Sequence, residues 1–212
     1  MSRRLPVYIL IDTSGSMRGE PIEAVKVGLA DMISSLRLDP YALDTAHISI
    51  ITYDRTVQQV LPLTDLEQLQ LPDIDCPESG PTFLGAALQL LCDLYDQEVR
   101  TGSSEQKGDW MPLLFVLTDG KPSDLLVYDQ AVEAIKQRPF SNIVACAAGP
   151  KAQTAPLKKL TDHVFTLDTM DRATFKRFFQ WVTINVQQGG RTIGVSEDTA
   201  LPPAPGEINI VL

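Results

Sequence analysis

Near its N-terminus the chain reads Val7-Tyr8-Ile9-Leu10-Ile11-Asp12-Thr13-Ser14-Gly15-Ser16. The apolar part of this stretch, residues 7–11, is mostly β-branched or aromatic and predicts a strand buried on both faces, as in a parallel sheet covered by helices. The strand stops at the carboxylate of Asp12, and the hydroxyls of Ser14 and Ser16 follow two and four positions later. Hard oxygen donors at the end of a buried strand suit Mg²⁺, which prefers oxygen ligands in octahedral geometry.

A second apolar run ends in the same way. Residues 111–117 predict another buried strand, which Thr118, Asp119 and Gly120 follow directly. Asp119 therefore closely follows this strand, as Asp12 follows the first. In a doubly wound sheet, ligands bind at the carboxyl ends of the strands where the strand order reverses, and these two strands would be neighbours there. We expect the two carboxylates to lie at one crevice.

Thr82 is the third candidate. It precedes apolar residues at helical spacing that continue to about Arg100, so its hydroxyl could bond a backbone N–H as a helix cap, or a metal. Each candidate residue also has a simpler interpretation when it is taken alone. Asp-x-Ser after a strand is often an Asx turn or a helix cap, and a lone threonine before a helix is usually a cap. The joint pattern is what favours a metal site.

Strand-like and helix-like segments alternate along the chain. The expected strands are residues 7–11, 46–53, 56–63, 111–117, 142–148 and 163–167, and the expected helices are residues 20–37, 82–100, 125–137, 156–160 and 171–186. Only Asp54 and Arg55 separate the second and third strands, which requires an antiparallel hairpin. The prediction is an α/β fold with a doubly wound, mostly parallel six-stranded sheet, one antiparallel edge strand and helices on both faces.

The segment Asp12-Thr13-Ser14-Gly15-Ser16-Met17 resembles the DxSxS signature of von Willebrand factor A (VWA) domains. In that family the motif belongs to the metal-ion-dependent adhesion site, which also uses a Thr ahead of a helix and an Asp that ends a second buried strand. The resemblance covers residues 4–186 and implies a Rossmann-like fold. It also implies Mg²⁺ as the bound ion, with Mn²⁺ or Ca²⁺ as alternatives. The implied metal ligands are Asp12, Ser14, Ser16, Thr82 and Asp119.

Within the family, the chain is most similar to the VWA proteins of bacterial tellurite-resistance clusters, the TerY-like group. This similarity is carried by the opening residues 3–22, by Ser79-Gly80-Pro81-Thr82 and by Leu117-Thr118-Asp119-Gly120-Lys121-Pro122-Ser123-Asp124. It implies a role in tellurite or general chemical-stress resistance, within a multi-protein complex.

Two parts of the chain are expected: a VWA domain over residues 1–188 and a proline-containing extension over residues 189–212. The prolines at positions 202, 203 and 205 exclude a helix in the extension. Its apolar end, residues 208–212, either folds back on its own domain or adds a strand to a partner. We favour folding back, because an exposed apolar end promotes aggregation.

The composition excludes several classes of protein. With a net charge of −9, the chain is a poor match for nucleic acid or anionic membranes, and no apolar run is long enough to cross a bilayer. Residues 2–11 imitate a signal peptide only weakly, because the apolar part is short and continues into the candidate ligands. Three widely spaced cysteines fit buried thiols in a reducing compartment. We therefore expect a cytoplasmic protein.

The expected function is a metal-dependent protein–protein interaction. An Asp or Glu of a partner protein would complete the coordination shell, and the bound cation would let an acidic chain hold an acidic partner. The alternative is a Mg²⁺-dependent phosphatase of the haloacid-dehalogenase type. Such an enzyme also uses a later Thr, Lys and Asp, and this chain has superficially similar residues in Thr118, Lys121 and Asp124. That chemistry requires a second carboxylate two residues after the nucleophile, and Ser14 occupies that position. We therefore predict a binding module without enzymatic activity.

Overall fold

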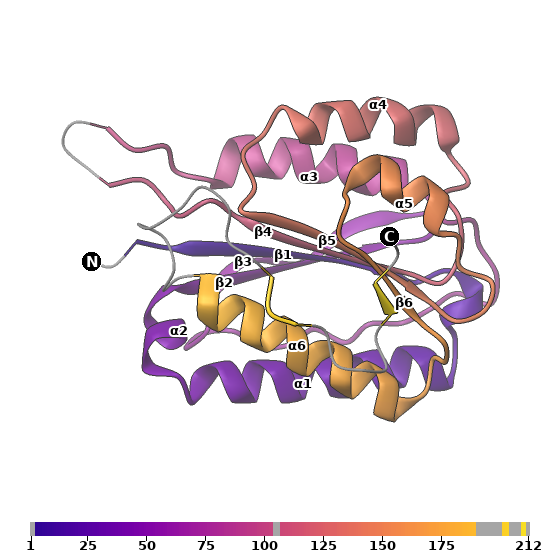
Figure 1. The fold of residues 1–212 in the computed structure, drawn as a ribbon, viewed down its shortest axis with the longest axis horizontal. Coiled ribbons are helices and arrows are strands. Elements are labelled where there is room, and N and C mark those ends of the chain that lie inside the picture. The colour runs from indigo at the N-terminus through magenta and orange to yellow at the C-terminus, as the bar shows by residue number, and fades with distance from the viewer. Residues whose placement is uncertain (1–2, 104–106, 190–200, 204–208, 211–212) are drawn as a thin grey trace.

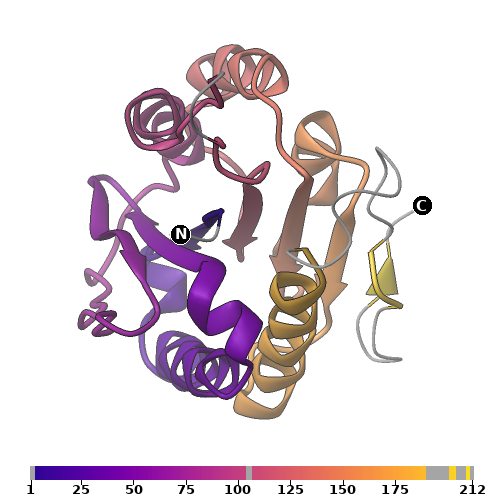
Figure 2. The ribbon, with the colours of Figure 1, turned by 90° about the vertical axis from the view of Figure 1, so that its left-hand side faces the viewer.

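A twisted sheet forms the middle layer of the molecule, and helices cover both of its faces (Figures 1 and 2). The computed structural model describes residues 3–103, 107–189, 201–203 and 209–210. The strands are β1 Leu5–Asp12, β2 Ala46–Tyr53, β3 Val57–Asp65, β4 Leu113–Thr118, β5 Asn142–Ala148, β6 Val164–Leu167 and β7 Asn209–Ile210. The helices are the 3-10 turn η1 Gly15–Met17, α1 Glu20–Arg37, α2 Pro40–Thr45, α3 Leu84–Glu98, α4 Leu125–Lys136, α5 Thr154–Leu160 and α6 Arg172–Gly189.

The strand order is β3-β2-β1-β4-β5-β6-β7. β1 lies at the centre and pairs in parallel with both β2 and β4, so the order reverses between β1 and β4. β3 is antiparallel to β2 and forms one edge. The predicted α/β fold, with six mostly parallel strands and an antiparallel edge strand, is confirmed. The two-residue β7 is an addition, which pairs antiparallel with β6 at the other edge.

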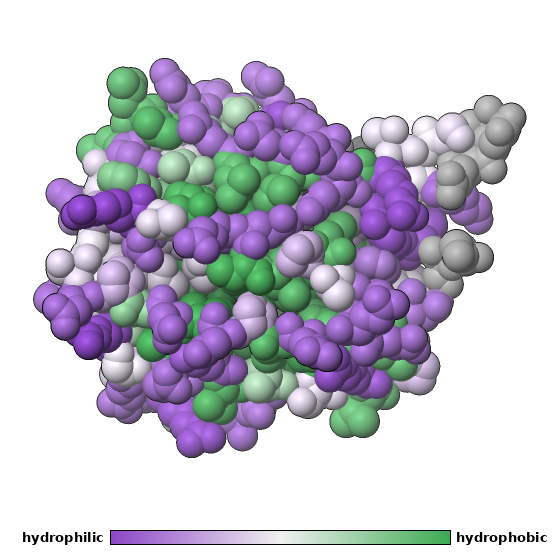
Figure 3. Space-filling view, turned by 180° about the vertical axis from the view of Figure 1, so that it is seen from behind, coloured by the Kyte–Doolittle hydropathy of each residue, from purple (hydrophilic) through white to green (hydrophobic). Residues whose placement is uncertain are grey.

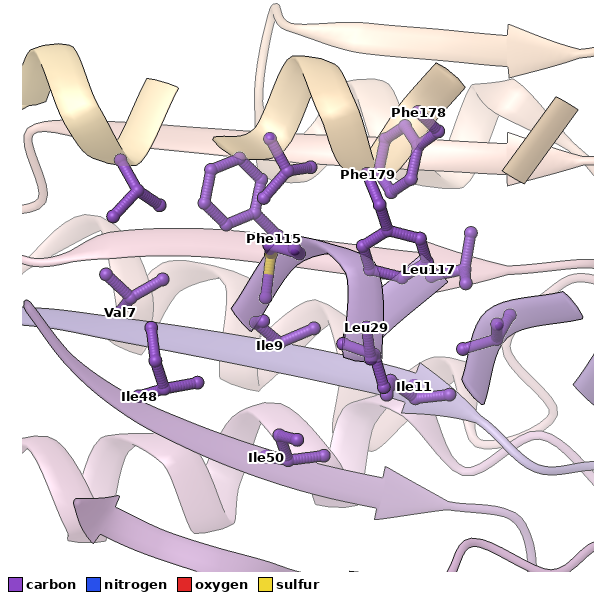
Figure 4. Close-up of a cluster of buried hydrophobic side chains, with 14 of the residues drawn as sticks. Val7, Ile9, Ile11, Leu29, Ile48, Ile50, Phe115, Leu117, Phe178 and Phe179 are labelled. Carbon is purple, nitrogen blue, oxygen red and sulfur yellow. The ribbon is translucent and has the colours of Figure 1, made fainter. Parts of the chain in front are cut away.

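The core has two halves because successive side chains of a strand point to opposite faces of the sheet. All eight residues of β1 are buried. Val7, Ile9 and Ile11 belong to the half that α1 and α6 cover, together with Phe178 and Phe179 of α6 (Figure 4). Tyr8 and Leu10 belong to the half that α3, α4 and α5 cover. This double burial explains why the strand reads as an uninterrupted apolar run.

The helix α2 was not predicted, because Asp39-Pro40 reads as the end of α1. In the structure Asp39 also begins the next helix. Its Oδ1 accepts hydrogen bonds from the backbone N–H groups of Tyr41 at 2.9 Å and Ala42 at 3.0 Å. Pro40 occupies the first helical position, where a missing N–H costs nothing. The same two residues therefore end one helix and start another.

Parts of the predicted extension lie on the domain. The indole N–H of Trp181 donates to the carbonyl oxygen of Pro202 at 3.1 Å, and Leu201 packs against the core. In β7, Asn209 is paired with Thr166 and Ile210 with Phe165, in line with the expectation that the apolar end folds back. Residues 208, 211 and 212 lie outside the described residues. The division at residue 188 stays a prediction.

Within the described ranges, no helix is both long and apolar enough to cross a lipid bilayer.

Gly28 provides a test of the packing between α1 and α6. A Cβ atom at this position would lie 2.3 Å from Cδ2 of Phe179, whose side chain is buried. We expect Gly28→Ala to lower the free energy of unfolding by about 1–3 kcal/mol through overpacking, although alanine is the better helix former by about 1 kcal/mol. Urea unfolding measures the change.

The control for Gly28→Ala is Ala30→Gly, at an exposed position two residues later in the same helix. It measures the propensity difference alone and should cost about 1 kcal/mol. A stabilising effect of Gly28→Ala would show that the two helices are not in tight contact at this point.

Candidate metal centre

Three loops meet at the carboxyl edge of the sheet, next to the point where the strand order reverses. The first follows β1, the second precedes α3 and the third follows β4. Because β1 and β4 are parallel neighbours, with Ile11 paired to Leu117, their carboxyl ends lie side by side. Asp12 is one residue after Ile11, and Asp119 is two residues after Leu117. Both acids are therefore at the same edge. This arrangement is the one that the two similar apolar runs predict.

The carboxylate of Asp12 is buried and both of its oxygens accept hydrogen bonds. Oδ1 accepts from the backbone N–H of Ser14 at 2.8 Å, and Oδ2 accepts from the hydroxyl of Thr118 at 2.7 Å. The first bond closes an Asx turn, so this simpler interpretation of the sequence is correct as far as it goes. It does not exclude a ligand role, since each carboxylate oxygen has a second lone pair.

Ser14 and Ser16 lie together in the first loop, with their Oγ atoms 3.2 Å apart. Ser14 is buried, whereas Ser16 is exposed. Gly15 between them is packed closely against the loop before Thr82, because a Cβ atom there would lie 2.7 Å from Cα of Ser79. The close approach of this second loop therefore requires glycine at position 15.

Thr13 ties the first loop to the end of β2. Its backbone N–H donates to the carbonyl oxygen of Tyr53 at 2.9 Å, and its hydroxyl donates to Oδ2 of Asp54 at 2.9 Å. The carbonyl oxygen of Asp54 in turn accepts from the backbone N–H of Phe83, next to Thr82, at 3.1 Å. Asp54 therefore links the first and second loops.

Thr82 is buried, and the third loop holds its backbone on both sides. The hydroxyl of Ser123 accepts from the N–H of Thr82 at 3.0 Å, and the N–H of Ser123 donates to the carbonyl oxygen of Thr82 at 2.8 Å. The Thr82 hydroxyl oxygen lies 3.7 Å from the position of a Cβ atom on Gly120. Thr82 is therefore beside the residue that follows Asp119.

Of the two roles that the sequence left open for Thr82, a cap of α3 or a metal ligand, the structure does not show the cap. The helix begins at Leu84, and the residue in the cap position, Phe83, makes no side-chain cap. The cap comes from the third loop: Oδ1 of Asp124 accepts from the N–H of Gly85 at 3.1 Å, and Oδ2 accepts from the N–H of Ala86 at 2.8 Å. A carboxylate at a helix N-terminus also interacts favourably with the helix dipole.

Sequence reasoning missed Asp54, Ser123 and Asp124 as residues that shape the site. Asp124 directly precedes α4, so its position in the sequence indicates a cap of α4. The structure shows no side-chain cap of α4 by Asp124, which instead bonds to α3. A side chain that caps a helix distant in sequence leaves no local pattern, so only the fold reveals it.

The carboxylate of Asp119 is the clearest indication that a cation belongs here. Asp119 is 4% exposed, and its Oδ1 is buried without a hydrogen-bond partner among the described residues. A buried carboxylate oxygen without a partner is energetically costly. Burial raises the pKa of Asp119, while the nearby hydroxyls of Ser16 and Ser14 and the charge of Lys151 act in the opposite direction. A bound cation would remove the cost.

The donors at this edge suit a hard divalent cation. All five candidates offer oxygen, from two carboxylates and three hydroxyls, which is the chemistry that Mg²⁺, Mn²⁺ and Ca²⁺ prefer. Within the described residues, no three His, Cys, Asp or Glu side chains are grouped so as to hold a metal ion. A cation at this edge would therefore depend on the hydroxyl groups.

This arrangement of a doubly wound sheet and three loops defines a class of protein. Residues 7–180 match the family model of the von Willebrand factor type A domain. The chain belongs to this family.

Relatives and solved structures agree with this assignment. Human Matrilin-3 is 30% identical over 178 residues, a match that covers 79% of this chain and 35% of that protein. The chain spans about a third of the length of the Matrilin-3 relatives it matches. Proximal thread matrix protein 1 of the mussel byssus, in a structure "with zinc occupied MIDAS motif", has a TM-score of 0.64 at 15% identity and covers 87% of this chain and 48% of its own. The VWA2 paralog of ArnB from Sulfolobus acidocaldarius has a TM-score of 0.58 at 18% identity, and the match covers 86% of this chain and 45% of that protein.

The cap that Asp124 provides can be tested by Asp124→Ala. The variant leaves two backbone N–H groups of α3 without their partner, so the free energy of unfolding should fall by about 1–2 kcal/mol. The control is Asp129→Ala, which removes an exposed ion pair with Lys159 and should cost well under about 1 kcal/mol. Equal effects in thermal or urea unfolding would contradict the role of Asp124.

The pKa of Asp12 predicts a pH dependence of stability in the absence of metal. Burial, together with the charge of Asp119, raises the pKa of Asp12 from its ordinary 3.8 to about 6, although hydrogen bonds from Ser14 and Thr118 oppose the change. Between these values the folded state binds the proton that the unfolded state has lost. The contribution of Asp12 to stability must therefore fall as the pH rises through this window.

This loss is measured by urea unfolding in EDTA at pH 4 and pH 7, for the wild type and for Asp12→Asn. Asparagine at position 12 does not titrate. The free energy of unfolding of the variant, relative to that of the wild type, should therefore rise by up to about 3 kcal/mol from pH 4 to pH 7, at 1.36 kcal/mol per pKa unit. If the two proteins keep a constant difference in stability, Asp12 does not titrate in this range.

Proposed function

We propose that the chain is a metal-dependent protein-interaction module. A divalent cation, Mg²⁺ in the first place and Mn²⁺ or Ca²⁺ as alternatives, binds between the three loops, and an Asp or Glu of a partner protein completes its coordination shell. The ligands in this proposal are Asp12, Ser14, Ser16, Thr82 and Asp119. The observation that carries it is the buried Oδ1 of Asp119, which has no hydrogen-bond partner in the described part of the chain.

The chemistry of the donors explains why a partner carboxylate would be attracted. Three of the five donors are neutral hydroxyls, and both oxygens of Asp12 already accept hydrogen bonds from Ser14 and Thr118. A cation held mainly by neutral donors keeps positive charge that an incoming carboxylate can neutralise. The cation would supply this attraction in a chain whose own net charge is −9.

The loops are held in place by hydrogen bonds that do not involve the cation. Thr13 is bonded to Asp54, Thr82 to Ser123, and the start of α3 to Asp124. Ligands that are fixed before binding lose little conformational freedom when the metal arrives. This preorganisation supports a binding site more than a set of side chains that serve only as turns and caps.

The family and one solved relative support the same proposal. The chain belongs to the von Willebrand factor type A domain family, and the mussel byssus protein with this fold has been solved with a zinc-occupied MIDAS motif. In this chain, the segment that begins at Asp12 resembles the DxSxS signature of such sites.

The cellular setting is also part of the proposal. The similarity of residues 3–22 and of the segments around Thr82 and Asp119 to the TerY-like group supports a role in tellurite or chemical-stress resistance, in a multi-protein complex. The three free cysteines, Cys76, Cys92 and Cys146, support a cytoplasmic location. The acidic charge supports protein partners, with neither nucleic acid nor a membrane as ligand.

The proposal includes no enzymatic activity, and the phosphatase alternative gains no support from the candidate residues. Thr118 donates its hydroxyl to Asp12, Asp124 caps α3, and Lys121 is exposed. Ser14 still occupies the position where that chemistry requires an acid–base carboxylate. A phosphoester assay with Mg²⁺ checks this point, since turnover that disappears in Asp12→Asn would favour the phosphatase.

Metal binding is tested by calorimetric titration of the full chain with MgCl₂ and MnCl₂ after treatment with EDTA. Asp119→Ala and Thr82→Ala should each weaken binding by about tenfold or more, because each removes a ligand from a preformed set. Asp93→Ala, an exposed carboxylate on α3, is the control and should bind as the wild type does. Circular dichroism confirms that each variant is folded.

Partner capture from a cell extract, with and without EDTA, tests the second half of the proposal. The captured protein should be lost in EDTA and in Asp119→Ala, and retained by Asp93→Ala. Metal binding that is unaffected by Asp119→Ala and Thr82→Ala, or capture that survives EDTA, would refute the proposed function.

A further inference from the structure

Two large apolar side chains are exposed at the start of α4. Leu125 is 52% exposed and Leu126 is 75% exposed. They do not contribute to the buried face of their own helix, which consists of Tyr128, Ala131, Val132 and Ile135. The other large apolar side chains that are exposed in the described part of the chain, Leu38, Met111 and Ile184, are far from one another in sequence. Adjacent exposed leucines are therefore a distinct feature of this surface.

The leucines are held at the edge of the sheet where the candidate ligands lie. They follow Asp124 directly, whose carboxylate is bonded to the start of α3, and Ser123 is bonded to both backbone groups of Thr82. Leu125 is six residues after Asp119, so the two are at most about 20 Å apart. A bound segment of about six extended residues can therefore contact both.

The space-filling view agrees with this placement. Figure 3 shows the molecule from behind, and apolar surface lies at its upper left, over the start of α4 at the carboxyl edge of the sheet. Polar surface lies next to it on the visible face. An apolar patch with a polar surround is typical of an interaction site.

The charges around this edge indicate what the patch would accept. Lys121 lies between Asp119 and the leucines in sequence and is exposed, and the charge of Lys151, also exposed, acts on Asp119. A bound divalent cation would balance the charges of Asp12 and Asp119, and the two lysines would then leave positive charge at this edge of a chain whose net charge is −9. An acidic segment is complementary to this field, and an apolar side chain is complementary to the leucines.

We infer that the occupant is a peptide segment of a protein partner that carries an Asp or Glu with a Leu, Ile, Phe or Trp within about six residues of it. This inference rests on the proposed function. The carboxylate binds at the metal centre, and the apolar side chain packs on Leu125 and Leu126. The leucines thus select among acidic partners, which the metal alone would not distinguish.

A phage-displayed library of random peptides tests this selectivity. The full chain is immobilised in MgCl₂ and bound phage are eluted with EDTA. The test variant carries Leu125→Ser and Leu126→Ser together, two substitutions at exposed positions. The control variant carries Leu38→Ser, which changes a leucine that is 85% exposed at the other end of the molecule, after α1.

We expect EDTA-eluted clones from the wild type and from Leu38→Ser to share an acidic residue with a nearby apolar residue. Clones from the double variant should keep the acidic residue and lose the apolar one. An apolar preference that is absent from the wild type, or unchanged in the double variant, overturns the inference and leaves the proposed function intact. A complete lack of EDTA-eluted clones overturns the proposed function, and this inference with it.

The strongest wild-type peptide then gives a quantitative check by calorimetric titration in MgCl₂. Replacing its apolar residue by alanine should weaken binding to the wild type by about tenfold and should not change binding to the double variant, as for two groups in direct contact. Equal weakening for both proteins means that the apolar residue binds elsewhere, which overturns the inference.

Discussion

The parallel pairing of β1 with β4 is the constraint on which the rest of the structure depends. It brings together two strands that are separated by about half of the chain and aligns Ile11 with Leu117. The carboxylates that follow the two strands then meet at one edge, and the hydroxyl of Thr118 bonds to Asp12 across the pair. Helices on both faces keep water from these strands, and both acids are buried where the strands end, among the hydroxyl groups of the loops.

The loops above this edge form a connected set. Asp54 joins the first loop to the second, and Ser123 and Asp124 join the third loop to the second. The links use backbone groups and the short side chains of Thr13, Asp54, Ser123 and Asp124, so the geometry depends little on long, flexible side chains. A displacement of one loop would therefore break hydrogen bonds to a neighbouring loop.

Burial of acidic groups at this edge is unfavourable for the protein alone. The pKa of Asp12 is raised to about 6, and Oδ1 of Asp119 has no partner among the described residues. Sites of this kind are usually retained for a function, since packing alone would favour neutral residues. In this chain the unfavourable burial and the three hydroxyl groups nearby have a common explanation in the proposed cation.

The sequence by itself determined the class of fold and the identity of the candidate ligands. The apolar run before Asp12 predicts a doubly buried strand, the run before Asp119 predicts another, and the short link at Asp54 predicts the antiparallel edge. These features are local, because they follow from the periodicity of side chains along a strand or helix.

Only the tertiary structure decided how the loops are held. That Asp124 caps α3 while Thr82 does not, that Asp39 starts α2, and that Asn209 and Ile210 pair with β6 could not be predicted. In the first and last cases the partners are far apart in the sequence, and a side chain or strand edge carries no local mark of the distant group that it will bond. Asp39 could equally end α1 or begin another helix, and the packing of the following residues made it do both.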